Sequence, residues 1–196
     1  MKLLKTIIKE LVNFLLFFIF FCPGKVGILL RKCILKVMLR ELGENFYSEI
    51  SLSITGYKNI TIQDNCIFMR YSSINADESS SIKIGNNISV NYNVNINSCN
   101  NGYIEIGDNV MIGQNTVLRA SDHIINDTNE KTSRQGHTGG KITIGNNVWI
   151  GANCVILKNV KIEDNAVIGA GTIVSKNINK NEVVVGNQQR TLKKNL

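Results

Sequence analysis

Apolar residues recur every six positions from Ile144 to Asn179, and this period predicts the architecture of the chain. The stretch divides into six words: IGNNVW, IGANCV, ILKNVK, IEDNAV, IGAGTI and VSKNIN. The first position of each word is aliphatic, the fifth is small or β-branched, and Gly, Asn, Asp and Lys are frequent between them. This period fits neither a helix, with about 3.6 residues per turn, nor the two-residue alternation of a hairpin. It predicts a solenoid of short strands that turns a corner after each inward-facing pair of residues.

The words group into coils of three, and the spacing between coils locates an insertion. Corresponding words are evenly spaced from Ile62 to Ile84 to Ile106, and slightly closer from Ile144 to Ile162. The step from Ile106 to Ile144 is more than twice as long as the step from Ile144 to Ile162. The surplus residues must leave the wall as a loop, which we place at residues 120–140. A loop of this length in a compact fold is usually functional.

The predicted loop, ASDHIINDTNEKTSRQGHTGG, contains both histidines of the chain, His123 near its start and His137 near its return. Histidine is the side chain that accepts a proton near neutral pH, so the pair suggests general base catalysis. The alternative is that one or both are solvated loop residues. A metal-dependent hydratase on such a solenoid would need three histidines around each zinc, so we expect no metal.

The first 45 residues follow a different pattern. The wholly apolar run FLLFFIFFC is shorter than the roughly 20 residues that a membrane span needs. From Val26 to Leu42 apolar residues recur at helical spacing. Eight basic and three acidic residues give this segment +5 of the chain's +7. The pattern predicts a basic amphipathic helical segment that either lies on an anionic membrane surface or caps the open end of the solenoid. Its polar side is predicted to hold Lys25, Arg31, Lys32, Lys36 and Arg40.

Composition narrows the class of protein. With 43% hydrophobic and 19% charged residues and a single Pro, the chain is not disordered. Its five cysteines form no CxxC pair, which favours a reducing compartment over a disulfide framework. No groove-reading motif accompanies the basic charge, so we expect no nucleic-acid partner. We therefore divide the chain into a helical segment at 1–45, a solenoid at 46–179 and a C-terminal tail at 180–196.

The words IGNNVWIGANCVIL, VIGAGTIVSKNI and VVVGNQQR resemble the C-terminal signature of the hexapeptide-repeat acyltransferases. The resemblance covers residues 54–196. It implies an all-β solenoid, a left-handed parallel β-helix with an N-terminal helical segment and one long protruding loop. It also implies acetyl-CoA as co-substrate and a homotrimer.

Among these enzymes, the loop and tail are similar to those of sugar O-acetyltransferases. The basic N-terminal segment favours those that decorate cell-surface polysaccharides, acting in the cytoplasm at the inner face of the membrane. Two alternatives remain open. One is an acetyltransferase of a small soluble acceptor, such as an antibiotic, a free sugar or serine. The other is a non-catalytic scaffold.

The resemblance implies roles for residues of the loop and of one earlier coil. His123 matches the family's general base, and Asn93, in the word NYN, matches an asparagine that orients the acceptor. His137 and Asp122 fall on the substrate side. Asp122 and Asp127 are both candidates to orient His123, and the sequence does not choose between them.

The resemblance also places coenzyme A along the last coils. Its pantetheine arm is expected beside the backbone of Ala152 and Ala170. Trp149 occupies the family's tryptophan position, where it either touches the cofactor or packs beside it. The positions expected near the phosphates are Ser175, Lys176, Arg190 and Lys193.

Overall fold

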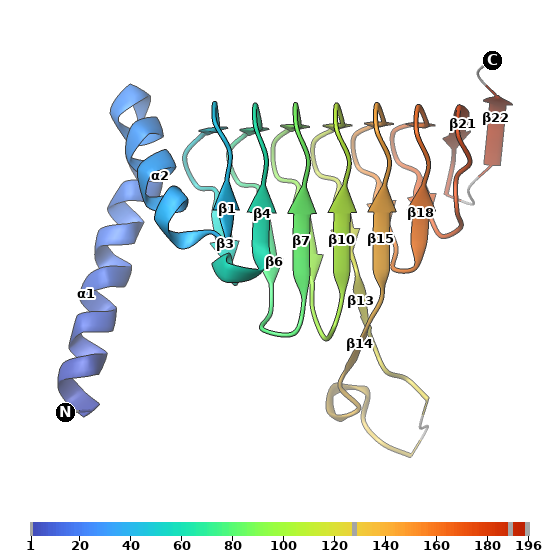
Figure 1. The fold of residues 1–196 in the computed structure, drawn as a ribbon. Coiled ribbons are helices and arrows are strands. Elements are labelled where there is room, and N and C mark those ends of the chain that lie inside the picture. The colour runs from blue at the N-terminus through green and yellow to red at the C-terminus, as the bar shows by residue number, and fades with distance from the viewer. Residues whose placement is uncertain (1, 127–128, 188–189, 195–196) are drawn as a thin grey trace.

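The chain winds into a three-sided solenoid of short parallel strands, closed at one end by two helices (Figure 1). The computed structural model describes residues 2–126, 129–187 and 190–194. The predicted left-handed parallel β-helix, with its N-terminal helical segment and protruding loop, is confirmed. Asp127, one of the two residues considered for orienting His123, lies outside the described residues.

Each wall of the solenoid is a sheet in which successive coils pair in parallel. Sheet A contains β1 (Glu41–Leu42), β4 (Ile60–Ile62), β7 (Ser81–Ile84), β10 (Tyr103–Ile106), β15 (Lys141–Ile144) and β18 (Val160–Ile162). Sheet B contains β2 (Tyr47–Ser48), β5 (Ile67–Phe68), β8 (Ser89–Val90), β11 (Met111–Ile112), β16 (Trp149–Ile150), β19 (Val167–Ile168), β21 (Glu182–Val185) and β22 (Arg190–Lys194). Sheet C contains β3 (Ser53–Thr55), β6 (Ser73–Ala76), β9 (Asn95–Ser98), β12 (Val117–Arg119), β17 (Val155–Ile156) and β20 (Ile173–Val174).

The inward side chains stack in columns, as the spacing of the words predicts. Parallel pairing aligns Ile62, Ile84, Ile106, Ile144 and Ile162 in sheet A. All twelve first- and fifth-position side chains of the six words are at most 2% exposed. Burying each large aliphatic side chain contributes about 1.5–3 kcal/mol, so these columns are the main source of stability.

Asparagines form the corners between the sheets. Thirteen of the described asparagines have φ between 54° and 63°, the left-handed region that Asn tolerates better than most residues. Their side chains form ladders along the solenoid axis. In one ladder Asn65 Nδ2 donates to Asn87 Oδ1, and Asn87 Nδ2 donates to Asn109 Oδ1, both at 3.1 Å. The high Asn content of the chain therefore reflects its corner geometry.

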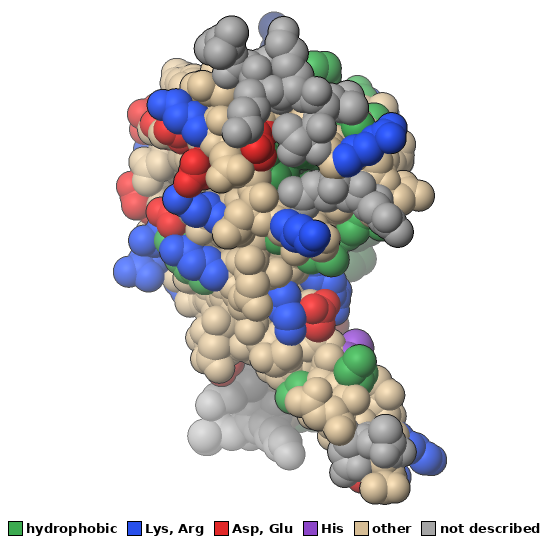
Figure 2. Space-filling view, turned by 90° about the vertical axis from the view of Figure 1, so that its right-hand side faces the viewer, with side chains coloured by type: hydrophobic (Ala, Val, Ile, Leu, Met, Phe, Trp, Pro, Cys, Tyr) green, Lys and Arg blue, Asp and Glu red, His purple; other side chains and the backbone are tan. Residues whose placement is uncertain are grey.

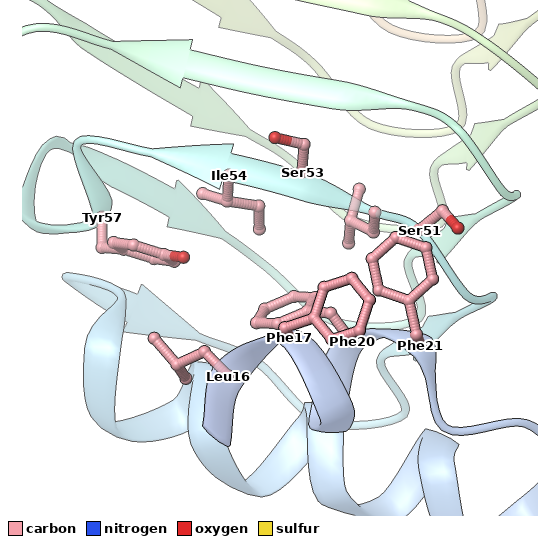
Figure 3. Close-up of a pocket in the computed structure, with 9 residues that line it drawn as sticks. Leu16, Phe17, Phe20, Phe21, Ser51, Ser53, Ile54 and Tyr57 are labelled. Carbon is pink, nitrogen blue, oxygen red and sulfur yellow. The ribbon is translucent and has the colours of Figure 1, made fainter. Parts of the chain in front are cut away.

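The N-terminal helices α1 (Lys2–Phe21) and α2 (Gly24–Met38) lie at the open end of the first coil. Leu35 of α2 is fully buried there, and in Figure 3 Leu16 and Phe20 of α1 lie beside Tyr57 and Ile54. Only the last turns of α1 pack in this way. No helix in the described part of the chain is both long enough and apolar enough to cross a membrane.

The prediction that Arg31 lies on the polar, solvent-facing side of its helix is wrong. Its side chain is 1% exposed. The guanidinium donates to the carbonyl oxygens of Ser48 at 2.9 Å and Cys22 at 2.7 Å, which joins α2 to sheet B and to the end of α1. Burial lowers the pKa of Arg31, and carbonyl oxygens rather than an adjacent carboxylate receive its hydrogen bonds.

The winding extends past both expected boundaries, 46 and 179. It begins with β1 at Glu41, where Leu42 aligns with Ile62. It ends with β21, which continues sheet B beside β19 through the start of the expected tail. Both ends depart from the six-residue pattern. Ser48 replaces a large apolar residue in the first coil, and at the other end the buried Glu182 stands where the preceding coil has Ala166.

Candidate active site

One corner of the solenoid carries a projecting arm. After β12 the chain leaves sheet C as the antiparallel hairpin β13 (Ser121–His123) and β14 (His137–Gly139), and it returns to sheet A at β15. Between the two strands lies a short 3₁₀ turn, Thr132–Arg134. The arm extends away from the body of the molecule, with a histidine side chain visible at its root (Figure 2). It lies between sheets C and A, which we call the C–A corner.

The root of the arm is fixed by the wall. The Ala120 amide donates to Asn97 O at 2.9 Å in the preceding coil, and the Gly140 amide donates to Ala120 O at 2.8 Å. Gly139 packs so closely on that coil that a Cβ there would overlap the carbonyl oxygen of Asn100. The two strands of the arm therefore start from positions that the solenoid sets.

His123 and His137 face each other across the arm. They are directly paired in the register of β13 and β14, with 3.2 Å between their Nε2 atoms and 3.9 Å between their ring centroids. At this distance one nitrogen donates a proton and the other accepts it. Both rings are exposed, so a substrate can reach them. The structure thus brings together the two histidines that the sequence analysis singled out separately.

Asp122 lies beside the histidines but is engaged elsewhere. Successive side chains of a strand point to opposite faces, which directs Asp122 away from His123. Its carboxylate pairs with Lys158 Nζ at 3.4 Å. Thus the side chain in contact with His123 is His137, and the structure gives no support to Asp122 as the residue that orients His123.

Lys158 was missed by the sequence analysis. It occupies the C–A corner of the next coil, between β17 and β18, in the word ILKNVK. With Asp122, His123 and Thr138 it lines a cavity of about 480 Å³. The stacking of corners was the available signal, since the residue above the root of an insertion must border the site.

Asn93 lies at a different corner, between sheets B and C. It has a φ of 55°, and its Nδ2 donates to Asn115 Oδ1 at 3.0 Å. Asn115 Nδ2 in turn donates to Asn153 Oδ1 at 3.1 Å. Asn93 thus has a structural part in this B–C corner, and its role in orienting the acceptor stays a prediction.

The expected cofactor positions are also divided between corners. Ala152 and Ala170 lie at the B–C corner, one coil apart, and Trp149 points outward from sheet B with 53% of its surface exposed. The Ala152 carbonyl accepts the Gly171 amide of the next coil at 2.8 Å. The other four lie elsewhere, two after β20 at the C–A corner and two in β22: Ser175, Lys176, Arg190 and Lys193. Within one chain the histidines and the expected pantetheine positions therefore occupy different corners.

The family model described as bacterial transferase hexapeptide (six repeats) matches residues 141–176. No curated protein sequence matches the chain. Among solved structures, a maltose O-acetyltransferase from Clostridium difficile 630 is 31% identical, with 91% of this chain and 82% of that chain covered and a TM-score of 0.62. A galactoside acetyltransferase in complex with coenzyme A is 29% identical, with coverage of 95% and 80% and a TM-score of 0.63.

A third structure shares the fold at lower identity. AntD, an N-acyltransferase from Bacillus cereus in complex with dTDP and 3-hydroxybutyryl-CoA, is 19% identical, with coverage of 85% and 88% and a TM-score of 0.70. The repeat pattern, the solenoid and the identity to the maltose enzyme agree with the resemblance found in the sequence. The chain belongs to the hexapeptide-repeat acyltransferases, the left-handed β-helix family that contains the sugar O-acetyltransferases.

Proposed function

We propose that this protein transfers the acetyl group of acetyl-CoA to a hydroxyl group of a sugar. The observation that carries the proposal is the His123–His137 pair, exposed at the root of the arm beside a cavity of about 480 Å³. Two of the similar proteins are a maltose O-acetyltransferase and a galactoside acetyltransferase, and the second is in complex with coenzyme A. Oxygen rather than nitrogen is the proposed acceptor atom, because the N-acyltransferase is similar only in fold.

In the proposed mechanism His123 is the general base. The resting state that suits this role has His137 donating its Nε2 proton to the Nε2 lone pair of His123. The acceptor hydroxyl then replaces His137 as donor, and its proton passes to His123 as the oxygen attacks the thioester carbonyl. The new C–O bond forms, the C–S bond breaks, and the thiolate of coenzyme A takes the proton from His123. General base assistance of this kind contributes on the order of 10²–10⁴ in rate.

The division of the predicted site between two corners supports a trimer. A closed three-fold ring joins two different surfaces of each subunit, so the C–A corner of one protomer can face the B–C corner of the next. Sheet B exposes two large apolar side chains, Met111 and Trp149, which would be buried in such an interface.

The proposed acceptor class is the sugar of a cell-surface polysaccharide, modified at the inner face of the membrane. The basic and apolar N-terminal segment supports this choice, because an enzyme that acts on a small soluble acceptor does not need such a segment.

The test is acetyl transfer from acetyl-CoA to a panel of neutral, amino and acidic sugars, followed through release of the coenzyme A thiol. We expect His123→Asn to lower kcat at least about a hundredfold while the Kd for coenzyme A, measured by calorimetry, stays unchanged. Glu78→Ala, at an exposed corner between β6 and β7 and away from the arm, is the control and should retain full activity.

Three results would contradict the proposal. Undiminished turnover by His123→Asn would show that His123 is not the general base. Absence of coenzyme A binding by the wild-type chain would favour a scaffold. A product resistant to hydroxylamine would identify an amide and therefore an N-acetyltransferase. Light scattering tests the trimer separately, and a monomer at assay concentration would exclude a site shared between subunits.

A further inference from the structure

The N-terminal helices carry most of the exposed apolar surface of the molecule. Of 22 large hydrophobic side chains exposed in the described residues, eleven lie in α1 and four in α2. Single exposed apolar residues are normal on soluble proteins, but a contiguous group of this size marks an interaction site. In α1 these residues are Leu3, Leu4, Ile7, Ile8, Leu11, Val12, Phe14, Leu15, Phe17, Phe18 and Phe21.

The exposed apolar residues of α1 form one face that the solenoid does not use. The opposite side of the helix packs on the first coil, where Phe20 is 8% exposed and lies near Tyr57 (Figure 3). The free face follows helical spacing along the whole helix, at Leu4, Leu11 and Phe18. The fold therefore accounts for the packed side of α1 and leaves the other without a partner.

The second helix extends this surface. A groove of about 540 Å³ runs between α1 and α2 and is lined largely by apolar side chains, among them Leu15, Phe18 and Leu30. Beyond it, Val26 is 65% exposed and Val37 is 73% exposed on the outer side of α2. The two helices thus present one continuous apolar face, which we call the helical face.

Lysines border the helical face. Lys9 of α1 and Lys25 and Lys36 of α2 are exposed. Lys36 pairs with Glu44 at 2.9 Å, and the first 45 residues still carry a net charge of +5. An apolar face bordered by lysines matches an anionic bilayer, whose acyl region takes the apolar side chains and whose head groups attract the cations. A protein partner would not need this border of positive charge.

We infer that the helical face docks on an anionic lipid bilayer, with α1 and the outer side of α2 lying in the plane of the head groups. Thr6, Lys9 and Asn13 support this orientation, because they recur at helical spacing as a polar stripe on the side of α1 that faces away from Leu11. The solenoid then projects into the aqueous phase. This inference concerns binding alone and does not depend on the proposed activity.

The first test is sedimentation of the full-length chain with vesicles that mix phosphatidylcholine and phosphatidylglycerol in a two-to-one ratio. The chain should bind these vesicles much more tightly than vesicles of phosphatidylcholine alone. Exchanging Lys9, Lys25 and Lys36 for Gln should weaken binding to the anionic vesicles about a hundredfold, since each lysine near the surface contributes about 1 kcal/mol. High salt should have a similar effect.

The second test separates the apolar face from charge. The double variant Leu11→Glu/Leu15→Glu should lower vesicle binding at least about a hundredfold, because two leucines no longer enter the acyl region. The matched control places the same charges on the polar stripe of α1, as Thr6→Glu/Asn13→Glu, and should bind more tightly than the leucine variant. Circular dichroism must show that both variants retain the wild-type fold.

Three results would overturn the inference. The first is equal vesicle binding by the leucine variant and its control. The second is no vesicle binding by the wild-type chain. The third is a wild-type chain that does not bind vesicles but is an oligomer that dissociates when Leu11 and Leu15 are changed. That outcome would show that the helical face covers another copy of the chain.

Discussion

The corner asparagines allow a direct test of how the solenoid turns. Asn87 has a φ of 58°, which is unfavourable for residues with a side chain other than Asn and Asp. Its side chain joins the ladder between Asn65 and Asn109 through two hydrogen bonds of 3.1 Å. Replacement by Ala removes both hydrogen bonds and leaves the left-handed backbone strained. Replacement by Gly removes the same hydrogen bonds without the strain.

The two terms give distinct magnitudes. The left-handed conformation costs Ala about 1–2 kcal/mol. Each exposed hydrogen bond lost costs on the order of 0.5–1 kcal/mol. We therefore expect Asn87→Ala to lower the free energy of unfolding by about 2–4 kcal/mol. Asn87→Gly should be less destabilising than Asn87→Ala by about 1 kcal/mol, since the greater freedom of unfolded Gly offsets part of the relief.

The control lies in the strand that follows. Ser89 is exposed in β8, an ordinary extended strand, where Gly should be worse than Ala by about 0.5–1 kcal/mol. The four variants are compared by urea denaturation at one protein concentration, followed by circular dichroism. The order of Ala and Gly should therefore reverse between Asn87 and Ser89. If the Ala and Gly variants had the same order of stability at both positions, backbone strain would not be the reason that Asn occupies the corners.

Three further predictions follow from the arm, the cysteines and the buried arginine. Gly139→Ala should lower acetyl transfer at least about tenfold with a native circular dichroism spectrum, because its Cβ overlaps Asn100 O and displaces the histidine pair. Exposed Cys33 should react rapidly with a thiol reagent at mildly alkaline pH, whereas Cys66 should react only after unfolding, since burial raises the pKa of its thiol to about 11. Arg31→Ala should expose residues 2–21 to limited proteolysis, because it removes the hydrogen bonds that hold the end of α1.

The architecture could be predicted because one local rule repeats. Each six-residue word buries its first and fifth side chains, so twelve positions agree independently on the same winding. The long step between Ile106 and Ile144 located the arm for the same reason. The first coil lacked this support, since Ser48 stands where later coils have a large apolar residue. Its winding is apparent from the parallel pairing of β1, β2 and β3 with the strands of the next coil.

Contacts between distant segments could not be predicted in this way. A hydropathy pattern assigns any basic residue to the polar side of a helix, but Arg31 is buried because Ser48 and Cys22 supply carbonyl acceptors from two other elements. The contact between His123 and His137 depends likewise on the hairpin register, which the largely polar sequence between them does not specify. In both cases the sequence identified the residue but not its partner.

The position of the histidine pair follows from the wall more than from the arm. The pair lies just beyond Ala120 and Gly140. The Ala120 amide is hydrogen-bonded to the preceding coil, and the Gly140 amide is hydrogen-bonded to Ala120 across the root of the arm. Beyond the pair, the hairpin continues through the Ile124 amide, which donates to Gly136 O at 3.0 Å. In the proposed function, a rigid solenoid would therefore fix the histidine that accepts the proton, and the tip of the arm would be free to vary with the acceptor. Under that proposal, one repeating fold could serve acyl transfer to different substrates, because a change at the tip would alter recognition without moving His123.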